Sequence, residues 1–124
     1  DMYLSRAECR ARMGDLIGAA ADLKVLRQHR MPVEIADIPA GLDKPGLIKY
    51  VIEERTREFA GMGDRWYTMR RLSGDPLFDI KPVHIIYATD GVTEKERIVM
   101  KPERLTQRLP IKIINQNPGI VNIP

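Results

Sequence analysis

The chain has little of what metal, disulfide or membrane chemistry requires: one cysteine and two histidines in 124 residues, and no long apolar run. A single cysteine, Cys9, cannot form an internal disulfide or a zinc site. His29 and His84 are far apart, and neither has another His or Cys at metal-ligand spacing. No segment approaches the roughly 20 apolar residues that span a bilayer, and no signal peptide is recognisable. We therefore expect no metal, no cofactor and no membrane-spanning segment.

Catalytic signatures are also missing. The serines are Ser5 and Ser73, and neither lies in a nucleophile elbow. The glycines around Met62 have no following Lys-Ser/Thr, so they do not form a phosphate-binding loop. Glu53 and Glu54 are adjacent, and adjacent helical positions point about 100° apart, so the two carboxylates do not converge. The net charge of +3 is small and interspersed, and aromatics make up 6%. We predict neither an enzyme nor a nucleic-acid-binding protein.

What the chain does have is helical periodicity, beginning with residues 1–30. Apolar residues recur at helical spacing over 2–13, and Gly14-Asp15 then supplies a stop followed by a cap. A second stripe follows, made of Leu16, Ala19, Ala20, Leu23 and Leu26. Two such stripes joined by a short turn predict a helical hairpin with close-packed alanines. Cys9 lies in the first helix, where we expect a buried, inert thiol. The hairpin resembles one tetratricopeptide unit, with a Tyr-Leu-x-Arg-Ala start and glycine at the turn.

Residues 44–72 predict a helix, a break and a second helix. Three prolines and two glycines in residues 31–46 exclude a continuous helix there, and Lys44-Pro45 marks the start of a third helix. Gly61 and Gly63 should interrupt that helix before Asp64 caps a short helix over 65–72. The apolar stripe of this region is expected to contain Ile48, Val51, Ile52, Phe59, Met62, Trp66 and Met69.

Arg55 falls on this apolar stripe and requires a partner, since an isolated buried ion costs several kcal/mol. Glu58 is three residues away, and Glu54, Arg57 and Arg65 are close in sequence. We expect a partly buried Arg/Glu network that fixes helix geometry, and a ligand-binding guanidinium is the alternative. If this network is buried, Arg65→Ala or Glu58→Ala should cost roughly 2–4 kcal/mol of stability.

Trp66 and Tyr67 form an aromatic pair that could stack on a sugar ring. Trp66 lies on the apolar stripe, which favours core packing, so Tyr67 is the freer candidate for a ligand contact.

Residues 73–124 predict loops, a hairpin and a tail. The segments 84–89 and 96–100 are strand-like and flank a loop that contains Asp90-Gly91, so a β-hairpin with a connection of about six residues is expected. The last stretch is apolar but interrupted by Pro110, Pro118 and Gly119. We expect it to run extended across the helices without an element of its own.

Three blocks together give the chain a family resemblance. The opening MYLSRAECRARMGDLIGAAADLKVLRQHR, the central EERTREFAGMGDRWYTMRR and the tail LPIKIINQNPGIVNIP resemble, in order and spacing, the C-terminal portion of SusD/RagB-type proteins. The central block carries Arg57-Glu58-Phe59 and Gly63-Asp64-Arg65-Trp66-Tyr67, and the tail carries Leu109-Pro110-Ile111 and Asn117-Pro118-Gly119. The chain departs from the family pattern at Met62, where an acidic residue is common, and at Lys112, where a second proline is usual.

The resemblance implies a mainly α fold: a tetratricopeptide-like hairpin plus further helices, a small β-hairpin and an extended, irregular tail. It implies one C-terminal region over 1–124, within a longer chain. It also implies a non-catalytic lipoprotein on the cell outer membrane that binds an oligosaccharide or peptide and works with a TonB-dependent, SusC-like transporter. Membrane attachment would then be only through a lipid anchor outside this sequence.

Within this resemblance, no ligand-binding residue carries over, Tyr67 stays a weak candidate, and Arg55, Glu58, Arg65 and Trp66 are interpreted as structural. The alternative function is a tetratricopeptide-type adaptor for protein interactions, which a secretory signal followed by a lipidated cysteine upstream would exclude.

Overall fold

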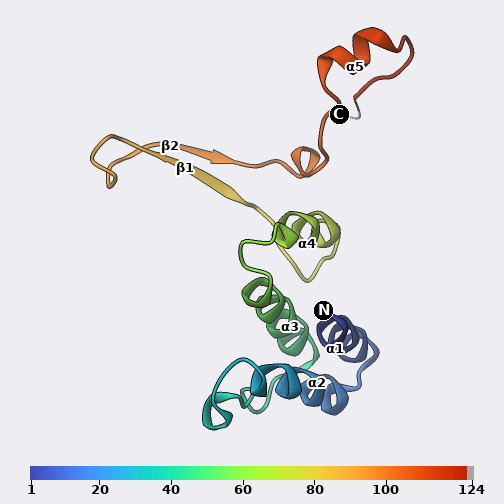
Figure 1. Ribbon diagram of the computed structural model, residues 1–124, viewed down its shortest axis with the longest axis vertical. Helices are drawn as coiled ribbons and strands as arrows, with labels where there is room; N and C mark the ends of the chain where they lie inside the picture. The colour runs from blue at the N-terminus through green and yellow to red at the C-terminus, as the bar shows by residue number, and fades with distance from the viewer. Residues whose placement is uncertain (123–124) are drawn as a thin grey trace. The chain divides into compact units, whose positions relative to one another are not determined.

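The computed structural model describes residues 1–122, apart from the side chains of residues 102 and 103. Within that range the chain forms five α-helices, two short 3-10 helices and one two-stranded antiparallel sheet, which confirms the mainly helical class with a small hairpin (Figure 1). The chain divides into two compact units, Asp1–Arg65 and Trp66–Pro124.

The first unit begins with the predicted helical hairpin. α1 is Met2–Met13 and α2 is Leu16–Gln28. Gly14 ends α1 with a φ of +94°, a left-handed conformation that glycine adopts without Cβ strain. Asp15 caps α2, and its carboxylate accepts a hydrogen bond from the Gly18 amide at 2.9 Å. Both boundaries agree with the sequence prediction.

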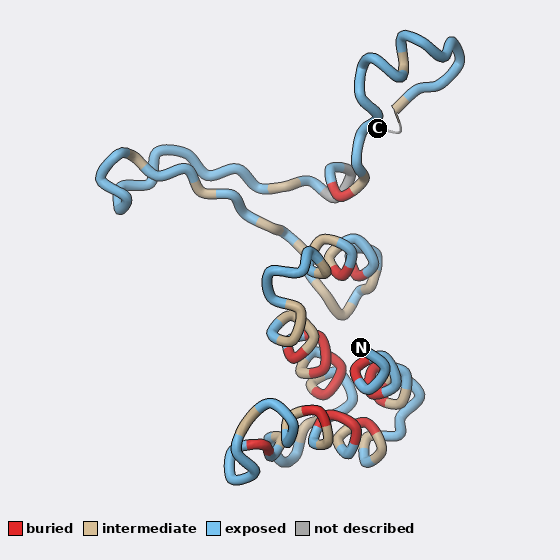
Figure 2. Tube along the Cα trace, viewed as in Figure 1, coloured by how far each residue is buried: buried red, intermediate tan, exposed pale blue. Residues whose placement is uncertain are grey.

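The core of the first unit lies between α1, α2 and a third helix, α3, which is Lys44–Glu58. Three of the six buried apolar side chains on α1 and α2 are alanines, so the two helices can approach closely. The buried apolar residues of this core are Leu4, Ala7, Ala11, Ala19, Leu23, Leu26, Ala36, Leu47, Ile48, Val51 and Ile52. Figure 2 shows the buried positions concentrated on these three helices.

Residues 31–46 contain only a short 3-10 helix, Val33–Ile35, as the prolines and glycines predicted. α3 starts at Lys44 with Pro45 in its first turn, and the Asp43 carboxylate accepts from the Gly46 amide at 2.8 Å. α3 ends at Glu58, and Gly61 and Gly63 follow with φ near +79° and +78° before α4, Asp64–Leu72.

Two sequence predictions about buried side chains are wrong. Met62 was expected on the apolar stripe but is 75% exposed, because the left-handed glycines on either side end the helical phase. Cys9 was expected to be buried but is exposed. α1 buries Leu4, Ala7, Glu8 and Ala11, and position 9 falls on its other face.

The second unit contains the predicted β-hairpin. β1 is Val83–Tyr87 and β2 is Glu94–Val99, paired antiparallel with an irregularity at Ile86/Tyr87. Residues 88–93 connect the strands, and the Asp90 carboxylate accepts hydrogen bonds from the Val92 and Thr93 amides. The hairpin exposes most of its side chains (Figure 2).

The tail differs from its prediction. α5, Ile111–Gln116, is a helix of its own, preceded by Pro110 and ended at Asn117. Proline is tolerated at the start of a helix, and no glycine or proline interrupts 111–116. A second 3-10 helix, Pro102–Leu105, lies between the hairpin and α5, and Leu105 is 1% exposed.

Candidate functional site

The helical hairpin is closed by a buried carboxylate. Asp22 on α2 is 3% exposed and accepts from Arg6 on α1 through both oxygens, at 2.9 Å from Nε and 2.6 Å from Nη2. Arg10 Nη1 donates to the same carboxylate at 2.8 Å and to the Gly18 carbonyl at 3.2 Å. This fork geometry gives Arg–carboxylate pairs both strength and a fixed orientation. Asp22 therefore fastens α1 to α2.

A second buried carboxylate fastens α2 to α3. Glu54 is 5% exposed and pairs with Arg27 at 2.9 Å and with Arg57 at 2.7 Å. The Arg27 guanidinium also donates to the backbone carbonyls of Ile35 and Ala36. One side chain thus ties together α2, the 3-10 helix and α3, and the paired and hydrogen-bonded charges offset their cost of burial.

Arg55 and Glu58 lie in separate ion pairs. Arg55 donates to Asp64 at 3.1 and 3.0 Å and to Asp1 at 2.7 Å, and its guanidinium lies 5.1 Å from the Phe59 ring centre. Glu58 accepts from Arg30 on both oxygens, at 2.7 to 3.1 Å. The charge on the α3 stripe is therefore neutralised by partners that sequence proximity did not identify.

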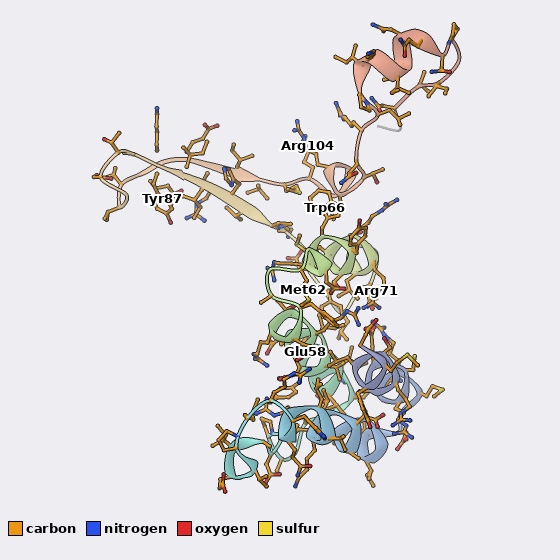
Figure 3. All side chains as sticks on the ribbon, viewed as in Figure 1. Glu58, Met62, Trp66, Arg71, Tyr87 and Arg104 are labelled. Carbon is orange, nitrogen blue, oxygen red and sulfur yellow. The ribbon has the colours of Figure 1, made fainter. Side chains whose placement is uncertain are left out.

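The other predicted residues lie beyond the helix break. Arg65 is exposed, Trp66 is half-buried, and Tyr67 is 69% exposed. Figure 3 labels Trp66 on α4. Tyr67 has the accessible ring that a stacking contact needs, whereas the exposure of Arg65 removes the basis for a large stability effect of its substitution.

The ion pairs also change carboxylate acidity. The hydrogen bond from Arg6 holds the pKa of Asp22 below its usual value, and the nearby charge of Arg10 acts in the same direction, against the effect of burial. The hydrogen bond from Arg30 likewise lowers the pKa of Glu58. Both groups stay ionised at neutral pH, as a structural ion pair requires.

A pocket of about 680 Å³ opens on the second unit. Its apolar part comes from Ile98 and Val99 at the end of β2 and from Met100, which follows the strand. Side chains alternate along a strand, so Glu96, Ile98 and Met100 share a face, and His84 of β1 pairs with Ile98. The backbone amide of Met100 donates to the Pro82 carbonyl at 2.8 Å and continues the hairpin pairing. The strand pairing thus fixes the position of these side chains.

The basic part of this pocket follows β2. Lys101 and Arg104 are three residues apart at a 3-10 turn, closed by the Arg104 amide donating to the Lys101 carbonyl at 2.9 Å. Residues at that spacing lie one above the other. Arg108 lines the same pocket, and buried Leu105 anchors the turn. Figure 3 labels Arg104 on this turn.

The first unit has a smaller apolar hollow of about 270 Å³, between the start of α2 and the loop before α3, lined by Leu16, Ile17, Ala20, Leu42 and Leu47 among others. It holds no charged side chain. Among the side chains that the structure describes, no cluster of His, Cys, Asp and Glu could hold a metal ion. None of the helices in residues 1–122 is both long and apolar enough to cross a membrane.

Sequence reasoning missed Asp22, Arg6, Arg10 and the pocket cations. A signal for Asp22 was present, because it lies three residues after Ala19 and four before Leu26, on the buried stripe of α2. A carboxylate there, in a hairpin whose first helix carries several arginines, indicates a clamp between helices. No comparable signal marked the pocket, because the strand face and the turn come together only through the hairpin fold.

The family model described as the SusD family matches residues 1–124. No curated protein matches the chain, and no solved structure does.

Proposed function

The chain belongs to the SusD family, and from that premise we propose that it is part of the nutrient-binding component of an outer-membrane uptake complex, with a glycan or oligosaccharide as its ligand. SusD family proteins are non-catalytic binding proteins, and the family implies a SusC-type partner. The single observation that carries the proposal is the family match over all 124 residues. It favours an uptake component over a general tetratricopeptide adaptor.

The geometry is consistent with a binding scaffold. The three helices of the first unit are joined by arginines that pair with two buried carboxylates, Asp22 and Glu54, and these pairs keep a surface in a fixed shape. The second unit supplies a hairpin and loops with accessible side chains, and loops on a rigid scaffold are the usual carriers of binding residues.

The remaining parts of the proposal follow from the family. The protein is expected at the cell surface on the outer membrane, attached by a lipid, with residues 1–124 as its C-terminal region and a TonB-dependent transporter as its partner. Arg55, Glu58, Arg65 and Trp66 then serve the structure of this region, while Tyr67 is a weak candidate for a ligand contact. A peptide is the alternative ligand class for the same component.

Co-purification tests this function. The full-length protein, extracted from native membranes in mild detergent, should bring with it a large TonB-dependent barrel in stoichiometric amount. Recovery as a water-soluble protein without any barrel would overturn the proposal and leave the tetratricopeptide adaptor as the hypothesis to pursue. A parallel digestion assay should show no hydrolysis of any glycan that binds.

A further inference from the structure

The cations of the second-unit pocket differ from the arginines of the first unit. All seven arginines before Arg65 are bonded to a carboxylate, and they are Arg6, Arg10, Arg12, Arg27, Arg30, Arg55 and Arg57. Within the part of the chain that the structure describes, Lys101, Arg104 and Arg108 form no ion pair. Three cations therefore line one pocket, and among the described residues that line it Glu96 is the one acidic side chain.

The composition of the pocket defines the ligand that fits. Arginine offers planar pairs of N–H donors that match the oxygens of a carboxylate or sulfate. Glu96 supplies a carboxylate that can accept from hydroxyl groups, and Ile98 and Met100 offer an apolar surface for a carbon skeleton. A volume of about 680 Å³ lies within the range of small-ligand pockets.

We propose that this pocket binds the acid group of an anionic saccharide, a uronate or a sulfate ester, with Arg104 and Arg108 on the acid oxygens and Glu96 on the ring hydroxyls. The inference rests on the proposed function, because it narrows the glycan to the acidic class. A neutral glycan would leave three cations of the pocket facing one carboxylate, that of Glu96, whereas an acidic glycan would pair with these cations and accept their hydrogen bonds.

The test measures binding of the full-length protein by calorimetry to three saccharides of equal length: an oligogalacturonate, a sulfated galactan fragment and the neutral galactan fragment. At least one acidic saccharide should bind, and the neutral one should bind at least about tenfold more weakly. Arg104→Gln and Arg108→Gln should each weaken acidic binding about tenfold or more, as expected for the loss of a charge-assisted hydrogen bond. Added salt should weaken the same binding by screening.

Arg70→Gln is the matched control. Arg70 is an exposed arginine on α4 that does not line the pocket, so the same charge change there should alter affinity by less than about twofold at moderate salt. Arg104 and Arg108 are also exposed, so thermal unfolding of all three variants should match that of the unchanged protein. This separates loss of a contact from loss of the fold.

The outcomes distinguish the two proposals. Equal binding of neutral and acidic saccharides, unaffected by either pocket substitution, would overturn the anionic pocket and leave the glycan-binding function intact. Binding of no saccharide would overturn the glycan function and this inference with it. An acidic peptide is titrated in the same way, and tighter binding of this peptide than of any saccharide, lost on Arg104→Gln, would also overturn the saccharide assignment and make the pocket a peptide site.

Discussion

The two units of this chain differ in how far they bury apolar side chains and pair their arginines. In Asp1–Arg65, the helices bury their apolar stripes and every arginine before Arg65 is bonded to a carboxylate. In the second unit, the hairpin and tail leave many apolar side chains accessible, among them Val83, Tyr87, Val99, Ile111 and Val121. An isolated two-stranded hairpin is marginally stable in water. The first unit is thus stabilised by its own contacts, whereas the second unit leaves apolar surface accessible for contact with other molecules.

The comparison is tested most severely by removing apolar groups from each unit. Leu23 is 1% exposed in the α2 stripe, so Leu23→Ala should cost about 2–5 kcal/mol of unfolding free energy. Val99 is 53% exposed, so Val99→Ala should change it by less than about 0.5 kcal/mol. Chemical denaturation measures both. Equal costs would mean that the hairpin side chain is covered in solution, and the contrast between units would fail.

The next largest effect is expected at the helix clamp. Asp22→Ala removes the shared partner of Arg6 and Arg10 and should cost about 1–3 kcal/mol, because the charge-assisted bonds between α1 and α2 are lost while the two guanidinium groups, 57% and 33% exposed, return to water. Asp37→Ala is the control. It breaks the pair with Lys24, whose side chains are 48% and 70% exposed, and should cost at most about 1 kcal/mol. Similar losses at the two sites would show that Asp22 is solvated.

Lowering the pH should remove the stabilising effect of the Asp22 clamp. The pKa of Asp22 is lowered in the folded protein by Arg6. Its contribution to stability is therefore complete above the unfolded value of about 3.9 and is lost as pH falls through the lower folded value. Melting temperatures of the unchanged protein and of Asp22→Asn should differ at neutral pH and converge in acid. A constant difference across the acid range would contradict the assignment of the pKa shift to this contact.

The smallest effects should separate Glu58 from Arg65. Glu58 has 17% side-chain exposure and a bidentate bond to Arg30, so Glu58→Ala should cost about 1 kcal/mol. Arg65 is exposed, so Arg65→Ala should cost less than about 0.5 kcal/mol. Thermal unfolding of the two variants side by side provides the measurement. A larger loss for Arg65→Ala would restore the original expectation of a buried network around it.

The fold was predictable where the signal was local. Glycine at the end of α1, aspartate at the start of α2 and proline in the first turn of α3 act within a few residues, and their helix boundaries were confirmed. The prediction of an extended tail was wrong because its prolines, interpreted as interruptions, instead flank a short helix. The predicted burial of Met62 was wrong because the two left-handed glycines beside it end the helical phase.

The site was less predictable because charge partners are chosen by tertiary proximity. Arg55 pairs with Asp1, 54 positions away in the sequence, and Glu58 with Arg30, 28 positions away. Sequence spacing predicted Glu58 as a partner of Arg55. It therefore identified that ion pairs exist but not which residues form them. The pocket cations could not be grouped from the sequence, because the register of the β-hairpin and the turn after β2 bring them together.

The Asp22 clamp has a consequence for the order in which the chain folds. Its two arginines lie only 16 and 12 positions from it along the sequence, and contacts between residues close in sequence form fastest, because little chain entropy is lost in closing a short loop. The helices α1 and α2 can thus dock against each other before α3 is in place. We expect this pair of helices to be the nucleus onto which α3 condenses, so Asp22→Ala should slow refolding. Substitutions in the β-hairpin should instead change mainly the unfolding rate.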